Sequence, residues 1–322
     1  MFLAVFSVVG VWHISGLGAS PGAVTTPLTV VYLLMKAAQL GSEEAAGFFL
    51  GSGQAEDGVW AGAPEAIVLL SSSEVIEGVR RADRVEDRLF NLSSRDGRVP
   101  EIIWKYLSRL YRELWESGLG VEIYLLATGI DDVDRVVRDA VVTVSALKGK
   151  EVWVNMVAGP NTVNLSLLIS SVILGAASRY YYIFQPKTQM LHPENVTFES
   201  LRNPGGVVGG LINLWVDIPI FQMELEPLLR RLREVYDVSP FINRAELKRI
   251  CDEYNVGLEK LKRLISFDGD RTSPSPLFRS YLGILKHLED APRNFSEWRE
   301  WGRRERILYT LDRETGRVRK LW

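Results

Sequence analysis

The sequence predicts a doubly wound α/β protein with a parallel sheet, followed by a smaller and mainly helical domain. Two observations support this fold class: the first half alternates short apolar runs with runs of helical period, and glycine-containing turns join them. With 322 residues, 47% of them hydrophobic, the chain can bury two cores. We expect a Rossmann-like domain over residues 1–185, a connector or dimer element over 186–221 and a winged helix-turn-helix-like domain over 222–322.

The first half follows the alternation expected of crossover connections, which place helices on both faces of a parallel sheet. The expected strands are Phe2–Ile14, Glu65–Leu70, Gly120–Thr128, Glu151–Val157 and Arg179–Phe184. The expected helices are Val24–Leu40, Glu74–Leu89, Pro100–Ser117, Asp131–Leu147 and Thr162–Ala177.

The second half changes character. Residues 185–220 are rich in Pro, Gly and Asn, which is typical of a connector. The helices expected after it are Glu224–Tyr236, Arg244–Tyr254, Leu258–Ile265 and Leu277–Leu288. A final hairpin is expected to pair Arg306–Leu311 with Arg317–Leu321, since Gly316 supplies the glycine that its turn needs.

Two short glycine-containing turns, more than a hundred residues apart, each follow an apolar run and open a helical run. They span Gly16–Ser20 and Asn155–Thr162. In a parallel sheet such turns gather at the carboxyl ends of the strands, where backbone N–H groups and a helix N-terminus can approach an anion. We therefore expect a site for a phosphorylated ligand, with Thr128 and Gly129 on its floor.

Other interpretations of these turns remain open. Ser20 before Pro21 makes a good helix cap in any strand-to-helix turn, and the second turn could also only begin a helix. A dinucleotide fingerprint is disfavoured because Pro21 stands where its third glycine should fall. The helix after the second turn, Val163–Gly175, is almost entirely small or apolar, so we expect it to be packed in the interior.

The run Gly18-Ala19-Ser20-Pro21-Gly22-Ala23-Val24-Thr25 resembles the first turn of the CARF domain, the sensor module of CRISPR-associated proteins that binds cyclic oligoadenylate. The second turn of that family commonly reads Asn-x-Thr-Gly-Gly-Thr-Lys. Here Asn155 and Gly159 match, whereas Asn161 stands in place of the Lys and brings no charge to a phosphate. The resemblance covers roughly residues 1–185.

The resemblance implies a homodimer in which a cyclic oligoadenylate, expected to be the tetra-adenylate ring, lies across the two-fold axis. Both turns of each subunit would contact this ligand, and no cofactor or metal is expected beside it. The expected ligand-binding residues are Ser15, Gly16, Gly18, Ala19, Ser20, Thr128, Gly129, Asn155, Gly159, Pro160, Asn161 and Thr162.

The segment Ile250–Ile265 has helix-turn-helix spacing, with Asn255 where the turn needs a left-handed residue. From Gln222 onward the chain carries 21 Lys and Arg against 17 Asp and Glu, while the rest carries 17 against 23. This pattern fits a DNA-binding face, and it also fits the solvated or partner-binding face of a helical bundle. The residues expected to contact DNA are Lys260, Lys262 and Arg263 on the second helix and Arg317 and Arg319 on the final hairpin, taken as the wing.

Two enzymatic alternatives follow from the resemblance. The HEPN ribonucleases found on other CARF proteins carry an Arg followed four to six residues later by His, and none of the three histidines fits. A ring nuclease remains as the alternative to a sensor: it cleaves cyclic oligoadenylate by attack of a ribose 2′-hydroxyl on the adjacent phosphate, which needs positioning and charge stabilisation. Its polar candidates are His13, Ser15, Ser20 and Asn161.

The remaining composition bounds the protein class. A single cysteine, Cys251, excludes an internal disulfide framework, and His13, His192 and His287 show no metal-ligand spacing. The apolar start, residues 1–11, lacks a basic beginning and is followed at once by interrupting polar residues, so a buried strand is expected rather than a signal peptide or membrane span. We expect a cytoplasmic protein without a membrane partner.

Overall fold

Five parallel strands form the centre of the main sheet in the computed structural model, which describes residues 10–50, 62–83, 85–94, 97–116, 121–184, 190–220 and 225–322. They are β1 (Val11–Gly16), β2 (Pro64–Ser71), β5 (Glu122–Ala127), β6 (Glu151–Asn155) and β7 (Arg179–Ile183). Their order is β5-β2-β1-β6-β7, so the chain winds outward from β1 in one direction and then returns to its other side. The predicted α/β class is confirmed, and the sheet is compatible with a Rossmann-like fold. Residues 2–9 of the expected strand Phe2–Ile14 lie outside the described residues.

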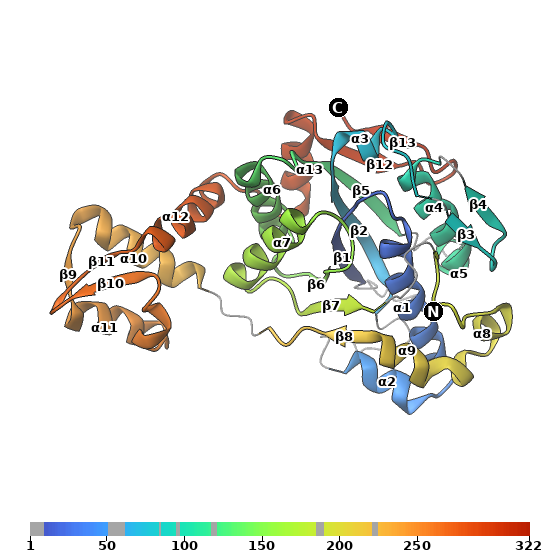
Figure 1. The fold of residues 1–322 in the computed structure, drawn as a ribbon, viewed down its shortest axis with the longest axis horizontal. Helices are drawn as coiled ribbons and strands as arrows, with labels where there is room; N and C mark the ends of the chain where they lie inside the picture. The colour runs from blue at the N-terminus through green and yellow to red at the C-terminus, as the bar shows by residue number, and fades with distance from the viewer. Residues whose placement is uncertain are drawn as a thin grey trace, which may run out of the picture.

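Helices cover both faces of this sheet (Figure 1). On one face α1 (Gly22–Gln39) packs against α4 (Val99–Leu110), and on the other α6 (Val133–Ala146) packs against α7 (Asn161–Leu174). The expectation that α7 lies wholly in the interior is wrong, because Leu165 is 56% exposed and Ile169 38% exposed. Among the described residues, α7 contacts α6, β1 and β6, so the side that faces them is the buried side.

Both edges of the main sheet are antiparallel. The short strand β8 (Trp215–Asp217) pairs with β7, and at the opposite edge β12 (Leu308–Leu311) pairs with β5 and carries β13 (Val318–Lys320). The expected final hairpin is therefore present, but its assignment as the wing of the helical domain is wrong. Its apolar strand fits the open edge of β5, where Leu308, Tyr309 and Leu311 become buried.

A small lobe projects from the main sheet between β8 and β12 (Figure 1). Its elements are, in order, α10 (Glu226–Val238), β9 (Ile242–Asn243), α11 (Arg244–Glu253), the 3₁₀ turn η2 (Leu258–Leu261), β10 (Ile265–Asp268), β11 (Arg271–Pro274) and α12 (Pro276–Glu289). The three strands form one antiparallel sheet in the order β10-β11-β9. The predicted domain boundaries at 185 and 222 stay predictions.

The expected second helix of the helix-turn-helix, Leu258–Ile265, is wrong in its second half. Only the single turn η2 is helical, and the chain is a strand from Ile265. The cause is a tight hairpin: Asp268 pairs with Arg271 around Gly269, whose φ of +60° suits such a turn. The expected left-handed residue Asn255 is observed, with φ +54°.

The segment between β2 and α4 also differs from expectation. In place of a helix over Glu74–Leu89, the chain forms the single turn α3 (Ser73–Ile76) and the hairpin strands β3 (Val85–Asp87) and β4 (Leu92–Ser94). Gly78, with φ +78°, ends the helix. The Asp87 carboxylate then accepts backbone N–H bonds from Leu89 and Phe90, which fixes the hairpin turn.

Several shorter elements complete the chain. They are α2 (Glu43–Phe49), α5 (Arg112–Glu116), α8 (Phe198–Arg202), the 3₁₀ turn η1 (Pro204–Val207), α9 (Val208–Leu214) and α13 (Phe295–Arg304). Sequence patterns did not predict α13, although it packs on α6 and its Trp298 Nε1 donates to Thr143 Oγ1 at 3.1 Å. No helix among the described residues is long and apolar enough to cross a membrane.

A buried histidine lies in the middle of the central strand. His13 is 2% exposed, sits between Trp153 and Tyr181, and has its Nδ1 3.3 Å from the Tyr181 hydroxyl. Burial lowers the pKa of His13 from 6.5 to about 3, because the protonated ring would lose its hydration. The folded protein therefore keeps this ring neutral.

This histidine should make stability depend on pH. Below about pH 6.5 the unfolded chain binds a proton at His13 that the folded chain rejects, so the free energy of unfolding falls as pH falls toward the folded pKa of about 3. The titration of His13 changes the free energy of unfolding by at most about 1.4 kcal/mol per pH unit. Urea unfolding of the wild type and of His13→Gln at a series of pH values from 7 to 4.5 measures it. An equally steep pH dependence in both proteins would contradict the assignment.

Candidate functional site

The first turn begins at Gly16, the end of β1, and hydrogen bonds to neighbouring segments fix its position. The Leu17 N–H donates to the Leu70 carbonyl at 2.8 Å, and the Ser71 hydroxyl donates to the Leu17 carbonyl at 2.7 Å. Further along, the Asp83 N–H donates to the Ala19 carbonyl at 3.0 Å. Ser20 does not cap the following helix as expected: Pro21 occupies the cap position, and no side chain caps α1.

The second turn is organised by Asn155 at the end of β6. Its side-chain oxygen accepts from the Val157 N–H at 2.8 Å, and its amide nitrogen donates to the Ala23 carbonyl in the first turn of α1 at 3.0 Å. Asn155 is 2% exposed, and its two hydrogen bonds join the second turn to the start of α1 in the interior of the protein. The helix α7 begins at Asn161 after Pro160, and no side chain caps it. Its first N–H groups therefore remain without a side-chain cap.

The two turns meet backbone to backbone at two glycines. A Cβ on Gly16 would lie 2.6 Å from the Ala158 carbonyl oxygen, and one on Gly159 would lie 2.5 Å from the Gly16 Cα. Gly159 also has φ +85°, a conformation that side chains with a Cβ rarely adopt. The contact is made where strand order reverses between β1 and β6, which is the position where open α/β sheets bind ligands.

The third predicted segment joins the same edge. The Thr128 N–H donates to the Ser71 carbonyl at 2.8 Å, and the Thr162 hydroxyl lies 3.5 Å from the Ile130 carbonyl. One buried oxygen here, Asn164 Oδ1, has no hydrogen-bond partner among the described residues, whereas the Thr128 side chain interacts with the Asp139 carboxylate. A buried oxygen without a partner is unusual in a folded interior and is common where a ligand or water completes the site.

The structure thus brings the predicted ligand residues together at the carboxyl edge of β5, β1 and β6. Along this edge lie Ser15, Gly16, Gly18, Ala19, Ser20, Thr128, Gly129, Asn155, Gly159, Pro160, Asn161 and Thr162. Two of the polar candidates for ring cleavage are unsuitable as they stand, because His13 and Ser15 are each 2% exposed within β1. Asn161 is exposed and Ser20 is half-buried.

The predicted DNA-contacting residues fall into two separate places. Lys260, Lys262 and Arg263 are exposed on and just after η2 in the small lobe. Arg317 lies just before β13 and Arg319 within it, at the edge of the main sheet. The structure does not unite these two groups in one surface.

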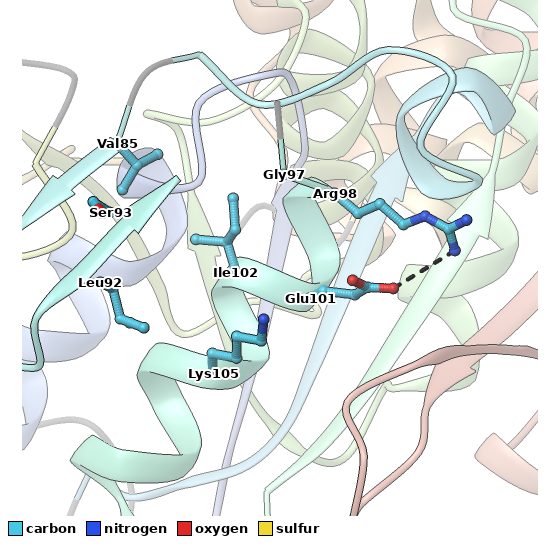
Figure 2. Close-up of a pocket in the computed structure, with 8 residues that line it drawn as sticks. All are labelled: Val85, Leu92, Ser93, Gly97, Arg98, Glu101, Ile102 and Lys105. Atoms are coloured by element: carbon cyan, nitrogen blue, oxygen red, sulfur yellow. Dashed lines mark ion pairs between the residues drawn. The ribbon is translucent and has the colours of Figure 1, made fainter. Parts of the chain in front are cut away.

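Two cavities lie away from the predicted ligand residues. One, of about 110 Å³, opens between the β3–β4 hairpin and α4. Figure 2 shows Arg98 and Glu101, 3.6 Å apart, directed away from the hairpin residues Leu92 and Ser93. The other, of about 340 Å³ and mostly apolar, lies between the end of β7 and α9, with Phe184 and Leu211 in its wall. Within the described residues no cluster of His, Cys, Asp and Glu could hold a metal ion.

Sequence reasoning missed one basic residue at the site. Arg135, in the first turn of α6, folds back over Gly129. Asp132 caps the helix, and its side chain accepts a hydrogen bond from the Arg135 N–H at 3.2 Å. The sequence did offer a signal for Arg135. Because α6 follows β5 directly, the first turn of α6 must lie at the carboxyl edge of the sheet, beside the ligand residues.

The sheet order and the helices on both faces show an α/β protein whose sheet is compatible with a Rossmann-like fold. No family model matches the sequence. The chain belongs to the same family as an uncharacterized protein of Archaeoglobus fulgidus, with 33% identity in an alignment 309 positions long that covers 91% of this chain and 96% of that relative.

Two solved structures show a distant likeness. Protein VC1899 from Vibrio cholerae has 10% identity and a TM-score of 0.28, over 86% of this chain and 66% of that one. Enterococcus italicus Csm6 bound to cyclic hexa-2′-fluoro-hexa-dAMP has 11% identity and a TM-score of 0.35, over 89% of this chain and 55% of that one. Neither likeness is close enough to assign a function.

The glycine contact can be tested by substitution. Gly159→Ala should lower the free energy of unfolding by about 2–4 kcal/mol, since the methyl group meets the Gly16 backbone and the φ of +85° is strained. Gly149→Ala is the matched control, because Gly149 has φ +96° but no atom within 4 Å of the added Cβ, so only the strain of about 1 kcal/mol remains. Chemical denaturation measures both. Equal losses would show that the close contact contributes nothing.

Proposed function

We propose that the protein is a sensor that binds a cyclic oligoadenylate at the edge formed by the two glycine turns. The observation that carries this proposal is the contact between Gly16 and Gly159 beside the uncapped N-terminus of α7. Backbone N–H groups of a helix start attract phosphate, and the absence of a Cβ on both glycines lets the two main chains meet, which places the first turn beside this helix start. The resemblance of the turn Gly18–Thr25 to the CARF domain supports the choice of ligand.

We propose further that two copies of the chain form the binding unit. The exposed apolar residues Leu165 and Ile169 follow Asn161 on α7, one and two turns away, so a partner that covers them also approaches the ligand edge. A second copy satisfies this geometry with the same surface on both sides of a two-fold axis, which suits a symmetric ring.

The small lobe is proposed to bind DNA. Its order of helix, strand, helix, short helical turn and hairpin is that of a winged helix, with β10 and β11 as the wing and η2 in place of a longer recognition helix. Lys260, Lys262, Arg263 and Arg271 are exposed and have no carboxylate within ion-pair distance in the described part of the chain. Such groups are free to contact phosphates.

Calorimetric titration with cyclic tetra-adenylate tests ligand binding. The expected result is saturable binding with one ring per two chains, and the ligand recovered by chromatography should be intact. If neither this ring nor the hexa-adenylate binds, the proposal fails. If the recovered ligand is cleaved in wild type and intact after Ser20→Ala, the protein is a ring nuclease rather than a pure sensor.

DNA binding has its own test. Lys262→Glu with Arg263→Glu should weaken retention of double-stranded DNA in a gel-shift titration by at least tenfold, since two positive charges on each lobe, four in a dimer, become negative. Arg317→Glu with Arg319→Glu makes the same charge change at the edge of the main sheet and should have little effect. Weak wild-type binding that ignores both changes would reject the DNA proposal and favour a protein partner for the lobe.

A further inference from the structure

The side chain of Arg135 occupies the space that Gly129 leaves open. Its Cδ lies 3.1 Å, and its Nε 3.7 Å, from where a Cβ on Gly129 would stand. Gly129 belongs to the turn after β5, and the Thr162 hydroxyl lies 3.5 Å from the Ile130 carbonyl of that turn. The guanidinium group is therefore close to the start of α7, where the second glycine turn ends.

A buried carboxylate holds this arginine loosely. The Asp139 side chain is fully buried, its Oδ2 lies 3.9 Å from Arg135 Nε, and the Thr128 side chain also interacts with this carboxylate. Its other oxygen, Oδ1, accepts two bonds from Arg138, at 3.0 and 3.1 Å. Arg138 also lies 3.6 Å from Glu305 and faces Trp301, so it is fixed on the α13 side. Arg135 thus remains 44% exposed and can turn to another anion while Asp139 keeps one cationic partner.

Other acidic groups near Arg135 have partners of their own. Asp132 caps α6, and the Asp134 carboxylate lies 3.4 Å from His287 Nε2 on α12. A phosphate with several oxygens can accept two parallel bonds from a guanidinium, which is stronger than a single contact at 3.9 Å.

We propose that Arg135 is a phosphate-binding residue of the ligand site, positioned by Asp139, and that it supplies the positive charge that Asn161 does not bring to the second turn. The anion is a phosphodiester group of the bound nucleotide ring. This inference rests on the proposed function, because it requires a phosphorylated ligand at this edge of the sheet.

The test compares two arginines that share the same carboxylate. Cyclic tetra-adenylate is titrated calorimetrically into wild type, Arg135→Gln and Arg138→Gln at several salt concentrations. Arg135→Gln should weaken binding by about ten- to a hundredfold and reduce the slope of log affinity against log salt by about two, because one ring loses an arginine from each subunit. Arg138→Gln removes the other cationic partner of Asp139 without approaching Gly129. Because Arg135 is then the remaining partner of Asp139, affinity should fall, but less than in Arg135→Gln, and the salt slope should stay close to wild type. Arg135→Lys should restore part of both.

The outcomes separate this inference from the proposed function. If wild type binds neither the tetra-adenylate nor the hexa-adenylate ring, the proposed function fails and this inference fails with it. If wild type binds and Arg135→Gln binds equally well with the same salt slope, only the role of Arg135 is overturned. If both glutamine variants lose affinity alike, Asp139 acts through the fold, and direct contact by Arg135 is overturned. Thermal unfolding of each variant shows that the comparison is made on folded protein.

Discussion

The close contact between Gly16 and Gly159 sets the geometry of the rest of the site. Side chains on either residue would push β1 and β6 apart at the point where the sheet changes direction. The Asn155 side chain bridges the two segments: it donates to the Ala23 carbonyl in α1 and accepts from the Val157 N–H in the second glycine turn. With the turns fixed, the start of α7 and the turn after β5 can only lie beside them. The absence of a Cβ on Gly16 and on Gly159 therefore determines where an anion could be accommodated.

The core of the fold and most of the site could be predicted because their signals are local. The apolar runs of β1, β2, β5 and β6 and the glycine turns are read directly from neighbouring residues. What failed depended on partners distant in sequence. The segment after Leu261 is apolar and basic enough for a helix. From Ile265 it pairs as strand β10 instead, because the turn at Gly269 folds β11 back on it. The final hairpin forms locally as predicted, but its location is decided by the free edge of β5.

The basic residues illustrate the same limit. The missing Lys at position 161 was visible in the sequence, whereas the placement of Arg135 over Gly129 depends on how α6 leaves its strand. His13 shows the reverse case, since its polar type suggested chemistry while its strand position buried it between aromatic rings. Residue type gives the available chemistry, and only the packing of distant segments decides which groups reach a surface.

The pairing of β12 with β5 joins residues 308–310 to residues 124–126, with the whole small lobe between them. A ribosome releases β5 long before β12, so the nascent sheet spends much of its synthesis with an unpaired strand at one edge. Exposed edges of that kind recruit other strands. The hairpin over residues 308–320 therefore closes this edge of the sheet, and a variant that lacks it would be prone to self-association even though every residue of the ligand edge is still present.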